Sequence, residues 1–167
     1  LESLWRQNVA TALLCSQAAL PLLEANSGTI VNIGSLAAKV GARYIGGYAT
    51  VIHAVAGMTQ HLRLERRPRG VTVALGSPGP IAREDAGQRY RDEVDDSLPE
   101  QASAPGGGTR IKGMPPEKVA AAVMKCIHRG AVDIVLPKYL RGLIAIGHAV
   151  PRLGDWLLLK FTSSRQS

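Results

Sequence analysis

The sequence predicts an α/β fold that forms one half of a doubly wound parallel sheet. Two continuous apolar runs, at residues 29–33 and 71–75, have the length and β-branched content of buried strands. The segment between them is long enough for a helix and carries apolar residues at helical spacing. Strands joined by a helix-length crossover pair in parallel with a right-handed connection. We therefore expect about three parallel strands with flanking helices, followed by C-terminal helices.

The first predicted helix covers residues 2–24. Apolar side chains recur there at spacings of three and four residues, between good helix formers. We expect Pro21 to kink this helix or to end its regular part, because proline has no backbone N–H to donate. The Asn-Ser-Gly turn at residues 26–28 then leads into the first strand, at residues 29–33.

A glycine-rich loop and a second long helix, predicted at residues 48–64, follow this strand. Arg69 and Gly70 end the helix, and the next strand is predicted at residues 71–75. The Gly-Ser-Pro-Gly-Pro run at residues 76–80 closes that strand as a turn.

The polar segment at residues 84–114 contains prolines and three consecutive glycines, which predicts a long lid-like loop. A third helix begins near the Pro-Pro-Glu sequence at 115–117, where proline is tolerated, and runs to about residue 129. Residues 133–136 are the third predicted strand. We assign residues 1–137 to a partial domain and residues 138–167 to a helical extension.

The extension combines large apolar residues with basic ones between residues 138 and 161. Pro151 is expected to split it into two helices. One interpretation packs these helices on the domain or on a second subunit. The alternative is an interfacial helix on anionic lipid, because a tryptophan and leucines flanked by basic residues suit that boundary.

Composition excludes several classes of function. The formal charge is +7, but the basic residues are scattered apart from a cluster at residues 63–69, and only 4% of residues are aromatic. Base-stacking platforms are therefore scarce, and we do not expect nucleic-acid binding. Cys15 and Cys126 are far apart and the four histidines follow no ligand spacing, so neither a disulfide nor a metal site is expected. With no signal peptide or long apolar run, we expect a cytoplasmic protein, with membrane-surface association through residues 138–161 as the alternative.

Asn8, Ser35 and Tyr48 form the candidate site. Ser35 comes 27 residues after Asn8, and Tyr48 comes 13 residues after Ser35. Ser35 follows a predicted strand, and Tyr48 opens a predicted helix. These spacings and contexts resemble those of the short-chain dehydrogenase/reductase family, and the chain is similar to the C-terminal portion of a classical-type member. The resemblance continues through the Pro-Gly turn at residues 78–81.

The resemblance implies a Rossmann-like domain that transfers hydride between an alcohol and a ketone with NAD or NADP. Ser35 would orient the oxygen of a small alcohol or carbonyl substrate, and Tyr48 would give or take the proton. Asn8 would support a proton-relay water. The two helices at 2–24 and 48–64 would form a homo-oligomer interface. The residues implied to contact the cofactor are Tyr48, Pro78, Gly79 and Ile81.

Two departures from the family pattern bear on activity. Ile52 stands four residues after Tyr48, where the family has lysine. A tyrosine with an ordinary pKa near 10 needs a nearby cation to act as a base at neutral pH, and isoleucine supplies none. The sequence also lacks the Gly-rich strand-turn-helix motif that binds dinucleotides. We therefore interpret the chain as a truncated family member with weak or no activity, and alternatively as a non-catalytic dimerisation or interaction protein.

Overall fold

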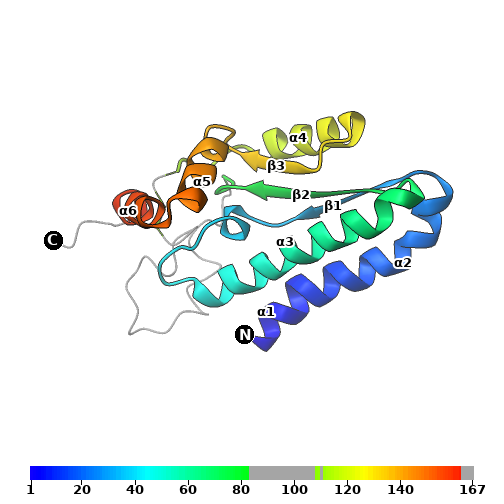
Figure 1. The fold of residues 1–167 in the computed structure, drawn as a ribbon, viewed down its shortest axis with the longest axis horizontal. Helices are drawn as coiled ribbons and strands as arrows, with labels where there is room; N and C mark the ends of the chain where they lie inside the picture. The colour runs from blue at the N-terminus through cyan, green and yellow to red at the C-terminus, as the bar shows by residue number, and fades with distance from the viewer. Residues whose placement is uncertain (83–107, 110, 163–167) are drawn as a thin grey trace.

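The computed structural model describes residues 1–82, 108, 109 and 111–162, which form an α/β arrangement around a parallel sheet (Figure 1). The described strands are β1 (Thr29–Ile33), β2 (Thr72–Pro78) and β3 (Asp133–Leu136), in the order β1-β2-β3. Both strand pairs are parallel, with Ile33 opposite Gly76 and Leu75 opposite Asp133. The predicted fold class and the parallel pairing are confirmed.

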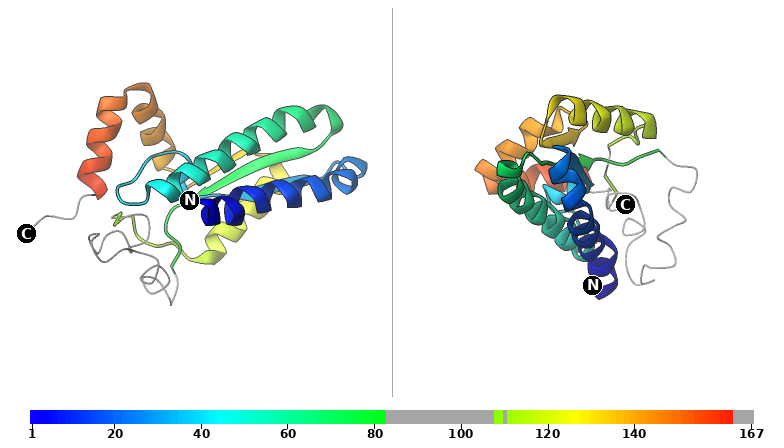
Figure 2. Two further views of the ribbon diagram at one scale, coloured as in Figure 1. Left: turned by 90° about the horizontal axis from the view of Figure 1, so that it is seen from below. Right: turned by 90° about the vertical axis from the view of Figure 1, so that its right-hand side faces the viewer.

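Helices cover both faces of this sheet. α3 lies against one face and α4 against the other, as a doubly wound sheet requires (Figures 1 and 2). Strand β2 lies between its two neighbours and is buried from Val73 to Pro78. The helical segments are α1 (Glu2–Trp5), η1 (Arg6–Ala10), α2 (Thr11–Ala25), η2 (Leu36–Ala38), α3 (Gly46–Arg66), η3 (Arg67–Arg69), α4 (Pro116–Arg129), α5 (Leu140–Ala149) and α6 (Pro151–Thr162).

Pro21 does not end the first helix, so that part of the prediction is wrong. It lies inside α2, which continues to Ala25. Leu23, in the turn after the proline, packs against a buried cluster that contains Leu62 and Val73. The apolar contacts of this turn offset the one backbone hydrogen bond that a proline removes.

Two further boundaries and the burial of one strand differ from prediction. α3 begins at Gly46, two residues before Tyr48. β2 extends to Pro78, beyond the predicted end at residue 75, because its last residues pair with β3 and Gly79 N–H donates to the carbonyl of Leu136 at 2.8 Å. β1 is not a buried strand: it lies at one end of the described strand order, and Ile33 is 53% exposed.

A buried hydrogen-bond chain fixes β1 to α3. Asn32 Nδ2 donates to Thr59 Oγ1 at 2.9 Å, and this hydroxyl donates to the carbonyl of Val55 at 2.6 Å. Both polar side chains are buried among apolar residues, where an unpaired group would cost stability. This pairing therefore sets the position of α3 over the sheet.

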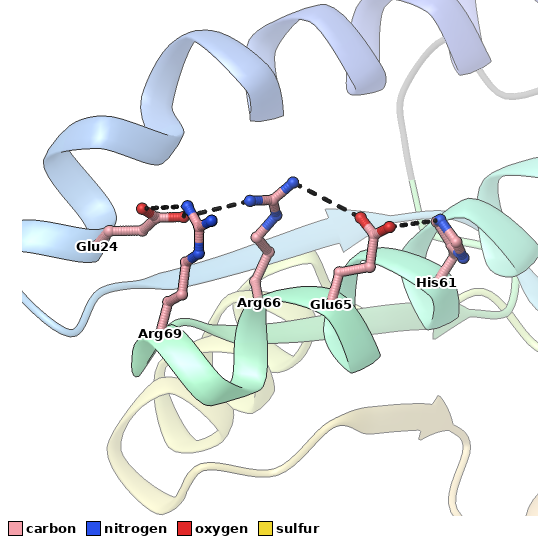
Figure 3. Close-up of polar contacts among 5 residues, drawn as sticks. All are labelled: Glu24, His61, Glu65, Arg66 and Arg69. Atoms are coloured by element: carbon pink, nitrogen blue, oxygen red, sulfur yellow. Dashed lines mark hydrogen bonds and ion pairs between the residues drawn. The ribbon is translucent and has the colours of Figure 1, made fainter.

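The basic cluster at residues 63–69 is largely occupied by contacts within the fold (Figure 3). Arg66 and Arg69 both reach Glu24 at the end of α2, at 3.4 and 3.1 Å. Arg63 donates to the carbonyl of Val132 at 3.0 Å. The contacts with Glu24 join the ends of α2 and α3 opposite the carboxyl ends of the strands, and the Arg63 contact joins α3 to the residue before β3.

The predicted split of the C-terminal extension is confirmed, because α5 ends at Ala149 and α6 begins at Pro151. Both helices are short. Within the described residues, no helix has the length and apolar character that a membrane span requires. The predicted loop at 84–114 falls mostly outside the described residues, but its C-terminal end is fixed by a parallel bridge between Ile81 and Met114.

Candidate active site

The carboxyl ends of all three strands lie at the same end of the molecule, where α3 begins (Figure 1). This edge is where open parallel α/β sheets bind ligands. Segment α1–η1 reaches the same place, since a Cβ atom on Gly47 would lie 3.6 Å from Leu4 Cδ1. The topology therefore brings the segments that carry Asn8, Ser35 and Tyr48 to one edge.

One buried cluster joins these three segments. Val9 of η1, Ala37 of η2 and Ala49 of α3 all belong to it. Each is within two residues of a candidate site residue, and Tyr48 itself packs against the cluster. The fold thus brings the three segments together, whereas the catalytic roles of the residues stay a prediction.

Asn8 lies in η1, a five-residue π-helical segment between α1 and α2. Its Nδ2 donates to the carbonyl of Leu4 at 2.9 Å, one turn earlier. Single π-helical turns inside α-helices occur frequently at functional sites, because they change the direction of side chains and backbone groups. No residue type in the sequence signals this turn.

Ser35 follows the end of β1 and caps η2. Its backbone is extended, and its Oγ accepts a hydrogen bond from the N–H of Ala37 at 3.2 Å. The preceding residue is held to the sheet, because Gly34 N–H donates to the carbonyl of Gly76 at 2.8 Å. A serine Oγ that accepts one bond still carries an O–H that can donate to a ligand oxygen. Capping and substrate binding are thus compatible roles for Ser35.

Tyr48 is the third residue of α3 and is half-buried. Ile52 follows one turn later and is 2% exposed. It packs in the same cluster as Ala37 and Leu75, and its Cγ2 would lie 3.5 Å from a Cβ atom on Gly34. The position that carries the family lysine is therefore an apolar core position in this chain.

Two basic side chains near this position make contacts of their own. His53 is exposed, and its Nδ1 lies 2.8 Å from the carbonyl oxygen of Ala49 in the previous turn. Lys39 lies four residues after Ser35, but its Nζ pairs with Asp133 Oδ1 at 2.8 Å. The sequence offered no signal for this ion pair, because its two residues are far apart along the chain.

The Pro-Gly turn lies beside η2. A Cβ atom on Gly79 would lie 3.1 Å from Leu36 Cδ1 and 3.3 Å from the carbonyl oxygen of Leu136, so a larger residue would crowd both neighbours. Pro78 is buried at the end of β2, and Ile81 is half-buried. Cofactor contact by these residues remains a prediction.

The fit to a dinucleotide is partial. The Pro-Gly turn that the family resemblance assigns to the nicotinamide end is present, but the Ile52 side chain offers no hydrogen-bond donor to a ribose. The cavity of about 260 Å³ on the α3 side is lined by Lys39, Arg63, Asp133 and neighbours, and by none of the predicted site residues. Among the residues that the structure describes, no group of three or more His, Cys, Asp or Glu is placed to hold a metal ion.

Burial raises the pKa of one cysteine thiol. Desolvation within the fold raises the pKa of Cys126, whose Sγ–H donates to the carbonyl of Ala131 at 2.9 Å. The thiol is therefore held in its neutral form, which is the unreactive form. Cys15 is exposed, and both cysteines are free.

Comparison with known proteins identifies relatives of the chain. The family model described as short chain dehydrogenase matches residues 1–94. Two proteins of Xanthobacter autotrophicus are each 36% identical to this chain over 83 residues, which is 49% of the chain. They are the inactive 2-(S)-hydroxypropyl-CoM dehydrogenase 2 and the 2-(S)-hydroxypropyl-CoM dehydrogenase 3. A short chain dehydrogenase from Burkholderia cenocepacia, solved in complex with NADP, superimposes with a TM-score of 0.69 at 23% identity and covers 95% of this chain.

The chain matches only part of each relative. The aligned segments are 36% and 32% of the two Xanthobacter proteins and 59% of the Burkholderia structure. The described fold therefore corresponds to a portion of the larger domain found in these proteins.

Proposed function

Because this chain belongs to the short-chain dehydrogenase family, we propose that it is the substrate-binding side of an NAD(P)-dependent oxidoreductase acting on an alcohol or a ketone. The observation that carries the proposal is the single buried cluster that unites η1, η2 and the first turn of α3. This cluster joins the segments that carry Asn8, Ser35 and Tyr48, whose spacing resembles that of the family.

The proposed roles follow from the chemistry of each side chain. The Ser35 hydroxyl donates a hydrogen bond to the substrate oxygen and holds it next to η2. The Tyr48 phenol gives a proton to this oxygen during reduction and takes it back during oxidation. Asn8 binds a water that returns the proton to solvent. A bound nicotinamide supplies or accepts the hydride.

Position 52 limits this chemistry in the chain as it stands. Ile52 lies in an apolar cluster, so position 52 supplies no ammonium group that would stabilise the ionised form of Tyr48 or bind the ribose. We therefore propose little or no turnover. One of the two Xanthobacter dehydrogenases is named inactive and the other is not, and both are 36% identical to this chain.

A fusion experiment tests the proposal. The chain is joined to the N-terminal cofactor-binding half of the Burkholderia dehydrogenase, and NADPH oxidation is followed with a panel of small ketones. We expect Ile52→Lys to raise the rate of the cofactor-loaded fusion at least tenfold. There the ribose hydroxyls and the ionised Tyr48 would keep the lysine charged, and one unit of pKa at the proton donor corresponds to about a factor of ten. Ile52→Met is the control and should give no gain. An equal rate for the parent and Ile52→Lys fusions would show that lysine loss is not the defect.

A second candidate function is a non-catalytic interaction protein. Trp5, Leu14 and Leu22 are exposed large apolar residues on α1 and α2, along the helices that are predicted to join two copies. Light scattering of the whole chain separates the two functions. A defined dimer that Leu14→Glu converts to a monomer supports the interaction role, and a polydisperse aggregate supports a truncated remnant of an enzyme.

We infer a cytoplasmic location from the cysteines. Cys15 and Cys126 are both free, and a reducing compartment keeps such thiols unpaired. Cell fractionation, with the protein followed by an antibody, tests this location.

A further inference from the structure

Helices α5 and α6 form a hairpin that projects from the end of the molecule where the strands terminate (Figure 2). Two glycines make the close contact between them: a Cβ atom on Gly154 would lie 2.8 Å from the carbonyl oxygen of Gly147. His148 Nε2 lies 2.6 Å from the carbonyl oxygen of Lys39 and attaches the hairpin to the loop after η2. A glycine contact therefore joins the two helices, and a polar contact joins the hairpin to the loop after η2.

The large apolar side chains of the hairpin are left facing water. They recur every three or four residues, through the turn at Pro151, so that both helices carry them. Each is at least 40% exposed. Exposed apolar residues on a folded protein are normally scattered singly, whereas here they recur along two successive helices. The residues are Tyr139, Leu143, Ile146, Val150, Leu153, Trp156 and Leu159.

Basic residues accompany this apolar surface. Lys138, Arg141, Arg152 and Lys160 are opposed within residues 138–160 by Asp155 alone, so the segment has a formal charge of +3. All four basic residues are exposed. Among the residues that the structure describes, none of these four side chains forms an ion pair with a carboxylate. This charge is complementary to an anionic surface.

Trp156 and Lys160 have the arrangement found at a boundary between water and hydrocarbon. The Lys160 Nζ lies 4.7 Å from the centre of the Trp156 ring, one helical turn away. Tryptophan is enriched at membrane interfaces, and lysine can extend from an apolar surface to keep its ammonium in water. The joint pattern of exposed apolar and basic side chains on two successive helices is typical of helices that lie at a lipid surface.

We propose that the α5–α6 hairpin binds the surface of an anionic lipid bilayer. Its helices have 10 and 12 residues, which is too short to cross the hydrocarbon core. The apolar side chains would enter the boundary between head groups and acyl chains, and the basic residues would contact anionic head groups. This binding is independent of turnover by the proposed active site.

Vesicle flotation of the full 167-residue chain tests the proposal. We expect the chain to float with phosphatidylcholine vesicles that contain phosphatidylserine, and to bind vesicles of phosphatidylcholine alone at least tenfold more weakly. Arg152→Gln and Lys160→Gln should each lower the partition coefficient about fivefold, as expected for one basic residue at such a surface. Lys118→Gln on α4 is the matched charge control and should have no effect.

Leu159→Glu tests the apolar contribution and should lower binding at least tenfold. The control is Met124→Glu on α4, because Met124 and Leu159 are similarly exposed, at 52% and 50%. Circular dichroism checks that both variants fold. Absence of flotation, or equal binding to both kinds of vesicle, would overturn the proposal. So would a dimer in lipid-free solution that Leu159→Glu dissociates, since the surface would then bind a second copy.

Discussion

Replacement of Ile52 by lysine tests whether position 52 belongs to the apolar core of this chain. The wild-type side chain is 2% exposed and packs with Val9, Ala37 and Leu75. In the unfused chain without a cofactor, a lysine there is taken out of water without a carboxylate partner among the residues of this cluster. Burial of this kind lowers a lysine pKa from about 10.4 to about 6. Each unit of pKa difference between the unfolded and folded states corresponds to about 1.4 kcal/mol. At low pH this difference lowers the unfolding free energy of the variant by about 6 kcal/mol.

The sign of the pH dependence follows from proton uptake. Below about pH 10.4 the unfolded chain carries a charged lysine, while the folded chain keeps it neutral until pH falls to about 6. The unfolded state therefore binds one more proton in this range. The stability of Ile52→Lys relative to wild type should fall by about 1.4 kcal/mol for each unit of decreasing pH.

Urea denaturation at about pH 9 and about pH 7 measures this slope. The difference in unfolding free energy between Ile52→Lys and wild type should grow by about 3 kcal/mol between these two pH values. Ile52→Met is the control, and its cost should stay below about 1.5 kcal/mol at both. A lysine variant as stable as the methionine variant at both pH values would show that position 52 is solvated, and would refute the core assignment.

Three further changes test the packing of the fold. Thr59→Val removes a buried hydroxyl and should lower the unfolding free energy by about 1–3 kcal/mol in a urea titration. Thr50→Val, on the exposed side of α3, is the control and should change it by less than about 0.5 kcal/mol. Glu24→Gln removes the carboxylate between two arginines and should lower the melting temperature, with Glu2→Gln as the exposed control that leaves it unchanged. Because the raised pKa of Cys126 favours the neutral thiol in the folded state, stability from this group is present below about pH 9 and is lost as pH rises above it. Cys126→Ala should therefore lose less stability than wild type between about pH 8 and pH 10; equal losses would contradict the assignment.

Elements with a strong local pattern were predicted well from sequence. The strand at residues 133–136 was placed at its observed bounds, and Pro151 was correctly expected to divide the C-terminal helices. Continuous β-branched runs bounded by glycine, and a proline at a helix start, determine structure through nearby residues alone.

The errors arose where tertiary contacts decide the structure. Pro21 remains inside a helix because the following turn packs on the core, and β2 extends to Pro78 because β3 pairs with its end. The site residues were predicted from their spacing, which resembles that of the family, and their roles stay a prediction. The π-helical turn around Asn8 and the pair between Lys39 and Asp133 depend on packing and on contacts distant in sequence, so no local pattern announces them.

Turnover by the unfused chain tests the central claim most directly, namely that this family member has its proton-transfer residues in place but lacks the lysine that activates them. NADH and NADPH oxidation is measured with small ketones for the wild-type chain and for Tyr48→Phe. We expect both proteins to show the same rate as buffer. A wild-type rate above buffer that Tyr48→Phe abolishes would contradict this claim, because Tyr48 would then act as a proton donor with Ile52 in place.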